Sequence, residues 1–159
     1  MSNRVFVLNP DQSPLMPCTA KRARMLLTAG RAAVWRRYPF TIILKVASGT
    51  RSQPLALKID PGSRVTGLAL VMNGKNGKQC LWGAELAHRG MAIKLKLLAR
   101  RALRSSRRSR KLRYRPARFL NRTRQAGWLP PSLMHRVLTT LSWARKIDRF
   151  TMMDSFSLE

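Results

Sequence analysis

Acidic residues are the scarcest chemical class in this sequence. Its 159 residues include 6 Asp and Glu against 32 Lys and Arg, so the formal net charge is +26. No acidic residue occurs between Glu85 and Asp148. A charge of this size far exceeds what solubility requires, and it makes the chain repel itself. The imbalance predicts a polyanionic partner, and nucleic acid is the obvious one because neutralised phosphates release counterions.

Cysteine is also scarce, and long apolar runs are absent. Cys18 and Cys80 lie far apart without a metal-binding spacing, and nothing in the sequence indicates secretion, so both are expected to be free thiols. The N-terminus lacks the charged segment and apolar run of a signal peptide, and the apolar stretches are much shorter than a membrane span. These absences predict a cytoplasmic protein with no membrane partner.

The remaining composition is that of a folded protein. Hydrophobic residues make up 45% of the chain, too many for a simple disordered basic tail. Turn signals and apolar periodicity predict strands over 4–8, 32–36, 40–46, 55–60, 65–72, 80–86 and within 150–159. They predict helices over 19–29, 91–114 and from Pro131 onward, and a stiff extended segment over 14–17. The pattern indicates an α/β fold with an antiparallel meander over residues 55–86.

The strongest positive feature is a run of Lys and Arg between residues 94 and 124. A solvated helix normally mixes both signs of charge, so a run of one sign favours phosphate binding. Arginine suits this role because its planar guanidinium binds a phosphate through two hydrogen bonds. The expected contact residues are Arg100, Arg101, Arg104, Arg107, Arg108, Arg110, Lys111, Arg113, Arg115, Arg118, Arg122 and Arg124.

Two carboxylates are candidate metal ligands, and each has an ordinary alternative. Asp60 ends an apolar strand, where ribonuclease H-like nucleases carry a metal-binding acid, but Asp-Pro-Gly is also a common turn opener. Glu159 would approach Asp60 if Phe156 and Leu158 belonged to a strand parallel to the Asp60 strand. Otherwise it is a solvated terminal charge. The residue pattern alone leaves both assignments open.

Several motifs follow one another in order and together cover nearly the whole chain. They are PLMPC at 14–18, GRAAV at 30–34, RRYPFTI at 36–42, LKIDPGS at 57–63, RRSRK at 107–111, RYRPARF at 113–119 and GWLPPS at 127–132. In this order they resemble the IscB family of transposon-encoded, RNA-guided DNA endonucleases.

The resemblance implies a specific organisation of the chain. It implies a small α+β domain of the Pro-Leu-Met-Pro type at 1–50 and the first segment of a ribonuclease H-like RuvC sheet at 51–88. An arginine-rich bridge helix and loop follow at 89–125, and a helix leading into the second RuvC segment follows at 126–159. It places Asp60 and Glu159 among the acids of a two-metal Mg²⁺ site. The implied partners are guide RNA and target DNA, with no obligate protein partner.

The same resemblance implies that the nuclease site is incomplete in this chain. Family members continue through a third RuvC segment with further metal ligands, in most cases after an HNH nuclease insertion. We therefore expect a truncated copy that binds Mg²⁺ poorly and does not cut DNA alone. Two alternatives stay open. One is a complete small RNA-binding protein without catalysis, and the other is a nuclease that recognises nucleic-acid structure without a guide.

Overall fold

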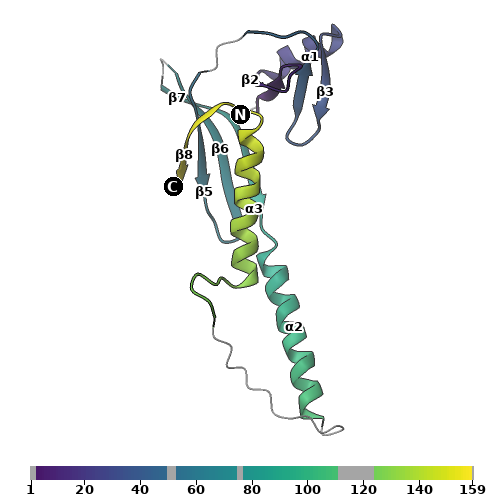
Figure 1. Cartoon of the computed structure of the whole chain (residues 1–159), viewed down its shortest axis with the longest axis vertical. Helices are drawn as coiled ribbons and strands as arrows, with labels where there is room; N and C mark the ends of the chain where they lie inside the picture. The colour runs from purple at the N-terminus through teal and green to yellow at the C-terminus, as the bar shows by residue number, and fades with distance from the viewer. Residues whose placement is uncertain (1–2, 50–52, 75–76, 111–123, 159) are drawn as a thin grey trace. The chain divides into compact units, whose positions relative to one another are not determined.

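The computed structural model describes residues 3–49, 53–74, 77–110 and 124–158. They form two compact units, Met1–Ala87 with Thr140–Glu159 and His88–Thr139. Within the described ranges the architecture is α/β, as predicted, with two four-stranded mixed sheets and three helices (Figure 1). No helix in these ranges has both the length and the hydrophobicity needed to cross a membrane.

The first sheet is formed by the N-terminal residues of the first unit. Its strands are β1 (Val5–Leu8), β2 (Pro14–Cys18), β3 (Ala32–Arg36) and β4 (Thr41–Leu44), in the order β2-β1-β4-β3. β1 pairs antiparallel with β2 and parallel with β4. The Pro-Leu-Met-Pro segment is therefore a sheet strand rather than only a stiff connection. Its edge position tolerates Pro14 and Pro17, because an edge strand can leave an N–H position unpaired.

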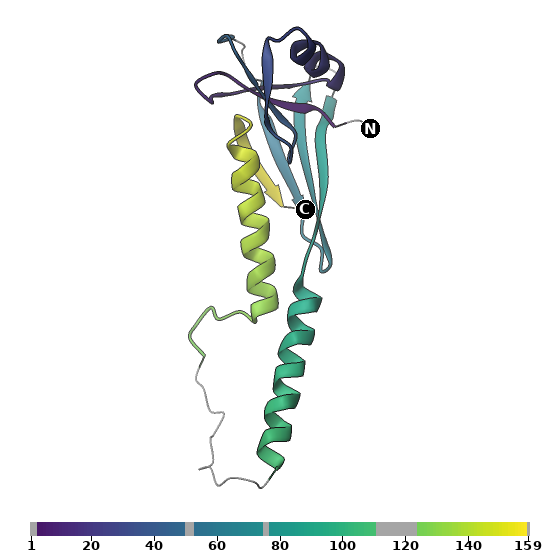
Figure 2. The same cartoon turned by 90° about the vertical axis from the view of Figure 1, so that its right-hand side faces the viewer.

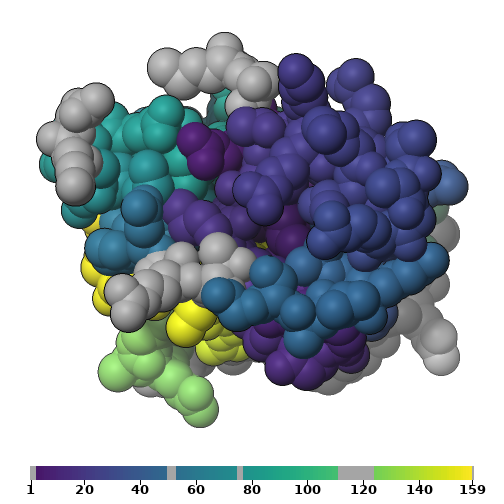
Figure 3. All heavy atoms as spheres, turned by 90° about the horizontal axis from the view of Figure 1, so that it is seen from above, coloured from purple at the N-terminus to yellow at the C-terminus, as the bar shows by residue number. Residues whose placement is uncertain are grey.

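Helix α1 (Ala20–Thr28) follows β2, and its buried Ala23 belongs to one hydrophobic cluster with Val7 of β1 and Ile42 of β4. The hydroxyl oxygen of Thr19 accepts a hydrogen bond from the backbone N–H of Arg22 at 3.4 Å, which caps the first turn. Gly30 follows the helix in the left-handed conformation, with φ of 66°, as expected for a C-terminal stop. Side chains of β1–β4 and α1 occupy much of the face shown in Figure 3.

The second sheet contains the predicted meander and one later strand. Its strands are β5 (Leu55–Asp60), β6 (Val65–Gly74), β7 (Gly77–Ala87) and β8 (Met153–Leu158), in the order β7-β6-β5-β8. β5, β6 and β7 pair antiparallel, whereas β8 lies parallel to β5 with Leu57 opposite Phe156 and Ile59 opposite Leu158 (Figure 2). The parallel strand considered for residues 150–159 is thus present.

A common core joins the two sheets of the first unit. Phe6 of β1 packs against Trp82 and Phe150, with ring centroids 5.6 Å and 6.2 Å apart. Ile147 of helix α3 (Pro131–Asp148) is fully buried in the same core. The backbone N–H of Arg4 also donates to the carbonyl of Leu81 at 2.8 Å. The start of β1 is therefore fixed beside β7.

The second unit contains helix α2 (Gly90–Ser109) and the N-terminal half of α3. The two helices approach closely at their starts, because a Cβ added to Gly90 would lie 3.6 Å from the carbonyl oxygen of Ser132. The helix predicted over 91–114 ends earlier than expected, since Arg110 has an extended backbone with φ of −73° and ψ of 106°. Residues 111–114 of that prediction lie outside the described residues.

The turn after Asp60 depends on a glycine. A Cβ on Gly62 would overlap the carbonyl oxygen of Val65, whereas one on Gly49 would meet nothing within 4 Å. We expect Gly62→Ala to lower the free energy of unfolding by about 1–3 kcal/mol, because the turn must shift to relieve the overlap. Gly49→Ala, the matched control, should change it by less than about 1 kcal/mol. Urea denaturation measures both, and equal stabilities would show that the turn relaxes without cost.

Candidate functional site

The basic residues of α2 cover one half of its surface. At 3.6 residues per turn, the cationic side is formed by Lys94, Lys96, Arg100, Arg101, Arg104, Arg107 and Arg108. The opposite side carries Leu95, Leu98 and Leu103, which are themselves more than half exposed. The helix has no buried residue and no acidic residue. The guanidinium groups are therefore available to a partner along the whole helix.

The charges on α2 are only partly compensated inside the helix. Arg107 and Arg108 lie in the last turn, where the negative end of the helix dipole stabilises cations. Arg104 Nε donates to the carbonyl of Arg100 at 3.2 Å, which orients one guanidinium along the helix. Repulsion between cations one turn apart remains, and it destabilises the helix. An anionic partner lying along this side would remove that repulsion.

The structure places only part of the predicted basic surface. Arg100, Arg101, Arg104, Arg107 and Arg108 lie exposed on α2, and Arg110 follows its last residue. The guanidinium carbon of Arg124 lies 4.0 Å from the centroid of the Trp128 ring, a cation–π contact. The other predicted residues lie outside the described part of the chain, namely Lys111, Arg113, Arg115, Arg118 and Arg122.

Asp60 lies at the end of β5, exposed to solvent, in a row that crosses three strands. It stands opposite Gly67 of β6, and Gly67 stands opposite Glu85 of β7. Residues opposite each other on neighbouring strands share a face of the sheet, so the two carboxylates flank a glycine on the same face. A Cβ on Gly67 would lie only 3.5 Å from the Cβ of Asp60. The glycine thus leaves open space between the two acids.

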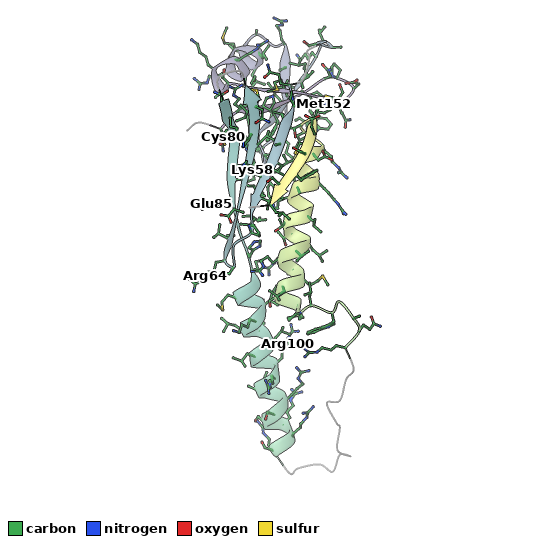
Figure 4. The ribbon with its side chains drawn as sticks, turned by 90° about the vertical axis from the view of Figure 1, so that its left-hand side faces the viewer. Lys58, Arg64, Cys80, Glu85, Arg100 and Met152 are labelled. Carbon is green, nitrogen blue, oxygen red and sulfur yellow. The ribbon has the colours of Figure 1, made fainter. Side chains whose placement is uncertain are left out.

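The neighbouring row on the same face of the sheet also contains residues with small side chains. Lys58 stands opposite Ala69, and Ala69 stands opposite Gly83. Together the two rows line a cavity of about 480 Å³ in which Lys58 is the cation and Asp60 and Glu85 are the anions. Figure 4 shows Lys58 and Glu85 on this sheet. Sequence reasoning did not find Glu85, because its position beside Asp60 depends on the register of two strand pairs.

The acids around Asp60 do not by themselves form a magnesium site. A two-metal site needs several oxygen ligands that hold both ions in fixed geometry. Over the described ranges, no group of three or more His, Cys, Asp or Glu side chains gathers as a metal site would require. Glu159 directly follows Leu158, the last residue of the strand parallel to β5, but Glu159 itself lies outside those ranges. The described donor set therefore does not fit the two ions.

Comparison with known proteins gives one match that spans both units. The family model described as RRXRR protein matches residues 5–159, which include every strand and helix described above. A search of curated proteins found no match.

Proposed function

The chain belongs to the RRXRR protein family, and on this basis we propose that it is the nucleic-acid-binding N-terminal part of an RNA-guided DNA endonuclease of the IscB type. Family membership supports the coarser part of this proposal, a nuclease-associated N-terminal domain. The finer assignment, a bridge helix that binds guide RNA, is supported by the ordered motifs and by the basic side of α2.

The exposed cationic side of α2 is the observation that carries this proposal. The helix has 20 residues and is about 30 Å long at its usual rise, so it can lie along several successive phosphates of a duplex. Arginines along it can contact successive phosphates of a guide RNA or of a guide RNA–target DNA duplex. In such complexes base pairing selects the sequence and the protein holds the backbone. Asp60 and Glu159 would hold Mg²⁺ only together with further oxygen ligands, which the described residues do not supply.

A second candidate function is a small RNA-binding protein without catalysis. The donor set around Asp60 favours it, because the described residues supply no third metal ligand and Lys58 lies in the same cavity. Both candidates require RNA binding through α2. They differ in whether Asp60 takes part in DNA cleavage.

Salt dependence tests the shared part of both proposals. We expect the affinity for a structured RNA to fall steeply as potassium chloride rises. Six arginines, Arg100, Arg101, Arg104, Arg107, Arg108 and Arg110, at about 0.7 each, predict a slope near −4 for log K against log salt. Filter binding at several salt concentrations measures this slope. RNAs of unrelated sequence should give similar values, because phosphates carry no sequence information. A slope near zero would refute phosphate binding.

A further inference from the structure

A second cavity, of about 440 Å³, lies within the first unit and has four aromatic residues in its lining. Tyr38 and Phe40 come from the connection between β3 and β4, Trp82 comes from β7, and Trp143 comes from α3. Its volume falls in the range of small-molecule sites, which is about 300–1,000 Å³. The basic side of α2 contributes no residue to it.

The aromatic rings differ in how tightly the fold holds them. Trp82 is 7% exposed and belongs to the core, whereas Tyr38 is 80% exposed. Trp143 packs against the core, and its ring is nearly perpendicular to that of Tyr38, at 83° with centroids 6.5 Å apart. A planar ligand that stacks on one of these two rings presents its edge to the other. A tyrosine so exposed, beside a partly buried indole, offers an open stacking surface.

Charged groups at the cavity match the polar parts of a nucleotide. Arg37 directly precedes Tyr38 and lines the cavity, so its guanidinium lies where it can bind a phosphate through two hydrogen bonds. Arg4 also lines the cavity, and one of its guanidinium nitrogens donates to the side-chain oxygen of Gln79 at 3.3 Å. A cavity with four aromatic residues and two arginines in its lining is complementary to a base joined to a phosphate.

We propose that this cavity binds one unstacked nucleotide of the RNA, with its base against Tyr38 and Trp143 and its phosphate at Arg37. The identity of the ligand as RNA rests on the function proposed above. Single-stranded RNA is commonly held in this way, by bases stacked on aromatic side chains. The site adds a base-dependent contact to the sequence-independent contacts of α2.

Free nucleotides test the cavity separately from α2. We expect AMP, CMP, GMP and UMP to shift the ring NMR signals of Tyr38 and Trp143 in the full chain, because stacking on an aromatic ring tolerates every base. Tyr38→Ala should weaken AMP binding by about 5- to 140-fold, the fold-change that corresponds to one lost stacking contact. Tyr38→Phe keeps the ring and should bind as the original chain does.

Trp35→Ala is the matched control, because Trp35 is 47% exposed in the same sheet and does not line the cavity. It should leave AMP binding unchanged, and circular dichroism checks that each variant is folded. The absence of any AMP-induced shift at Tyr38 and Trp143, or an equal effect of the Trp35 and Tyr38 variants, would overturn the proposal. Such a result would favour a protein segment as the occupant.

RNA titrations distinguish two outcomes: that the aromatic cavity does not bind a nucleotide, and that the chain does not bind RNA through α2. Tyr38→Ala should weaken RNA binding and leave the salt slope unchanged, because the phosphate contacts of α2 remain. A steep salt dependence of RNA binding, without any NMR shift on adding nucleotides, would overturn the nucleotide site and leave phosphate binding by α2 intact. A nucleotide response with a flat RNA slope would support the site and refute the proposed function.

Discussion

Replacing Arg104, Arg107 and Arg108 together by glutamate is expected to weaken RNA binding by roughly 10³-fold, since each charged hydrogen bond to phosphate contributes about 1.5 kcal/mol. The three side chains lie exposed on the cationic side of α2, within little more than one turn of the helix. Repulsion between the new carboxylates and phosphate adds to the loss. The effect should be the same for RNAs of different sequence, because these contacts are to the backbone.

Fluorescence anisotropy with a labelled RNA hairpin measures this change, and the salt slope should become shallower by about 2 as three phosphate contacts are lost. The matched control replaces Lys21, Arg22 and Arg24 by glutamate. These residues are also exposed on a helix, α1, and the substitution changes the net charge by the same amount. Equal losses in the two triple variants would show that total charge, and not the surface of α2, determines binding.

Local patterns predicted most of the elements correctly. The alternation of Leu55, Leu57 and Ile59 gave a strand whose three apolar side chains are buried, and the turn at Pro61 and Gly62 gave an antiparallel neighbour. Such features depend on residues close in sequence, where turn chemistry and side-chain period are decisive. The α/β class followed from these elements.

Features that depend on distant partners were predicted less completely. The Pro-Leu-Met-Pro segment was expected to be extended, but its role as strand β2 depends on β1 offering a free edge. The end of α2 at Ser109 was also missed, because Arg115 and Pro116 were taken as the first helix-breaking signal.

The candidate sites also differ in whether they depend on residues close in sequence or on distant partners. The basic side of α2 follows from helical periodicity and was predicted from the sequence. The row of Asp60, Gly67 and Glu85 needs the register of two strand pairs, which single residues do not reveal. The aromatic cavity joins Tyr38 to Trp143, more than one hundred positions away, so only the folded chain brings them together.

We expect that this chain alone does not cleave DNA in the presence of Mg²⁺. Mg²⁺ demands near-octahedral oxygen coordination and dehydrates reluctantly, so it stays mobile beside a small number of carboxylates. Over the described ranges, Asp60 has Glu85 on its face of the sheet, Lys58 in the same cavity and no third ligand. Losing the positioning of the reacting groups alone corresponds to a rate roughly 10⁵-fold lower than that of a complete site.

Nicking of supercoiled plasmid in the presence of Mg²⁺ detects this reaction, because one cut per molecule relaxes the plasmid. The chain, its Asp60→Ala variant and a protein-free control should give the same rate, with and without added RNA. RNA binding by Asp60→Ala should equal that of the original chain, since Asp60 lies on β5 and the cationic residues lie on α2. Nicking that needs Mg²⁺ and disappears in Asp60→Ala would contradict the expectation. It would mean that Asp60 works with ligands beyond those the described residues bring together, and that this chain is itself a nuclease.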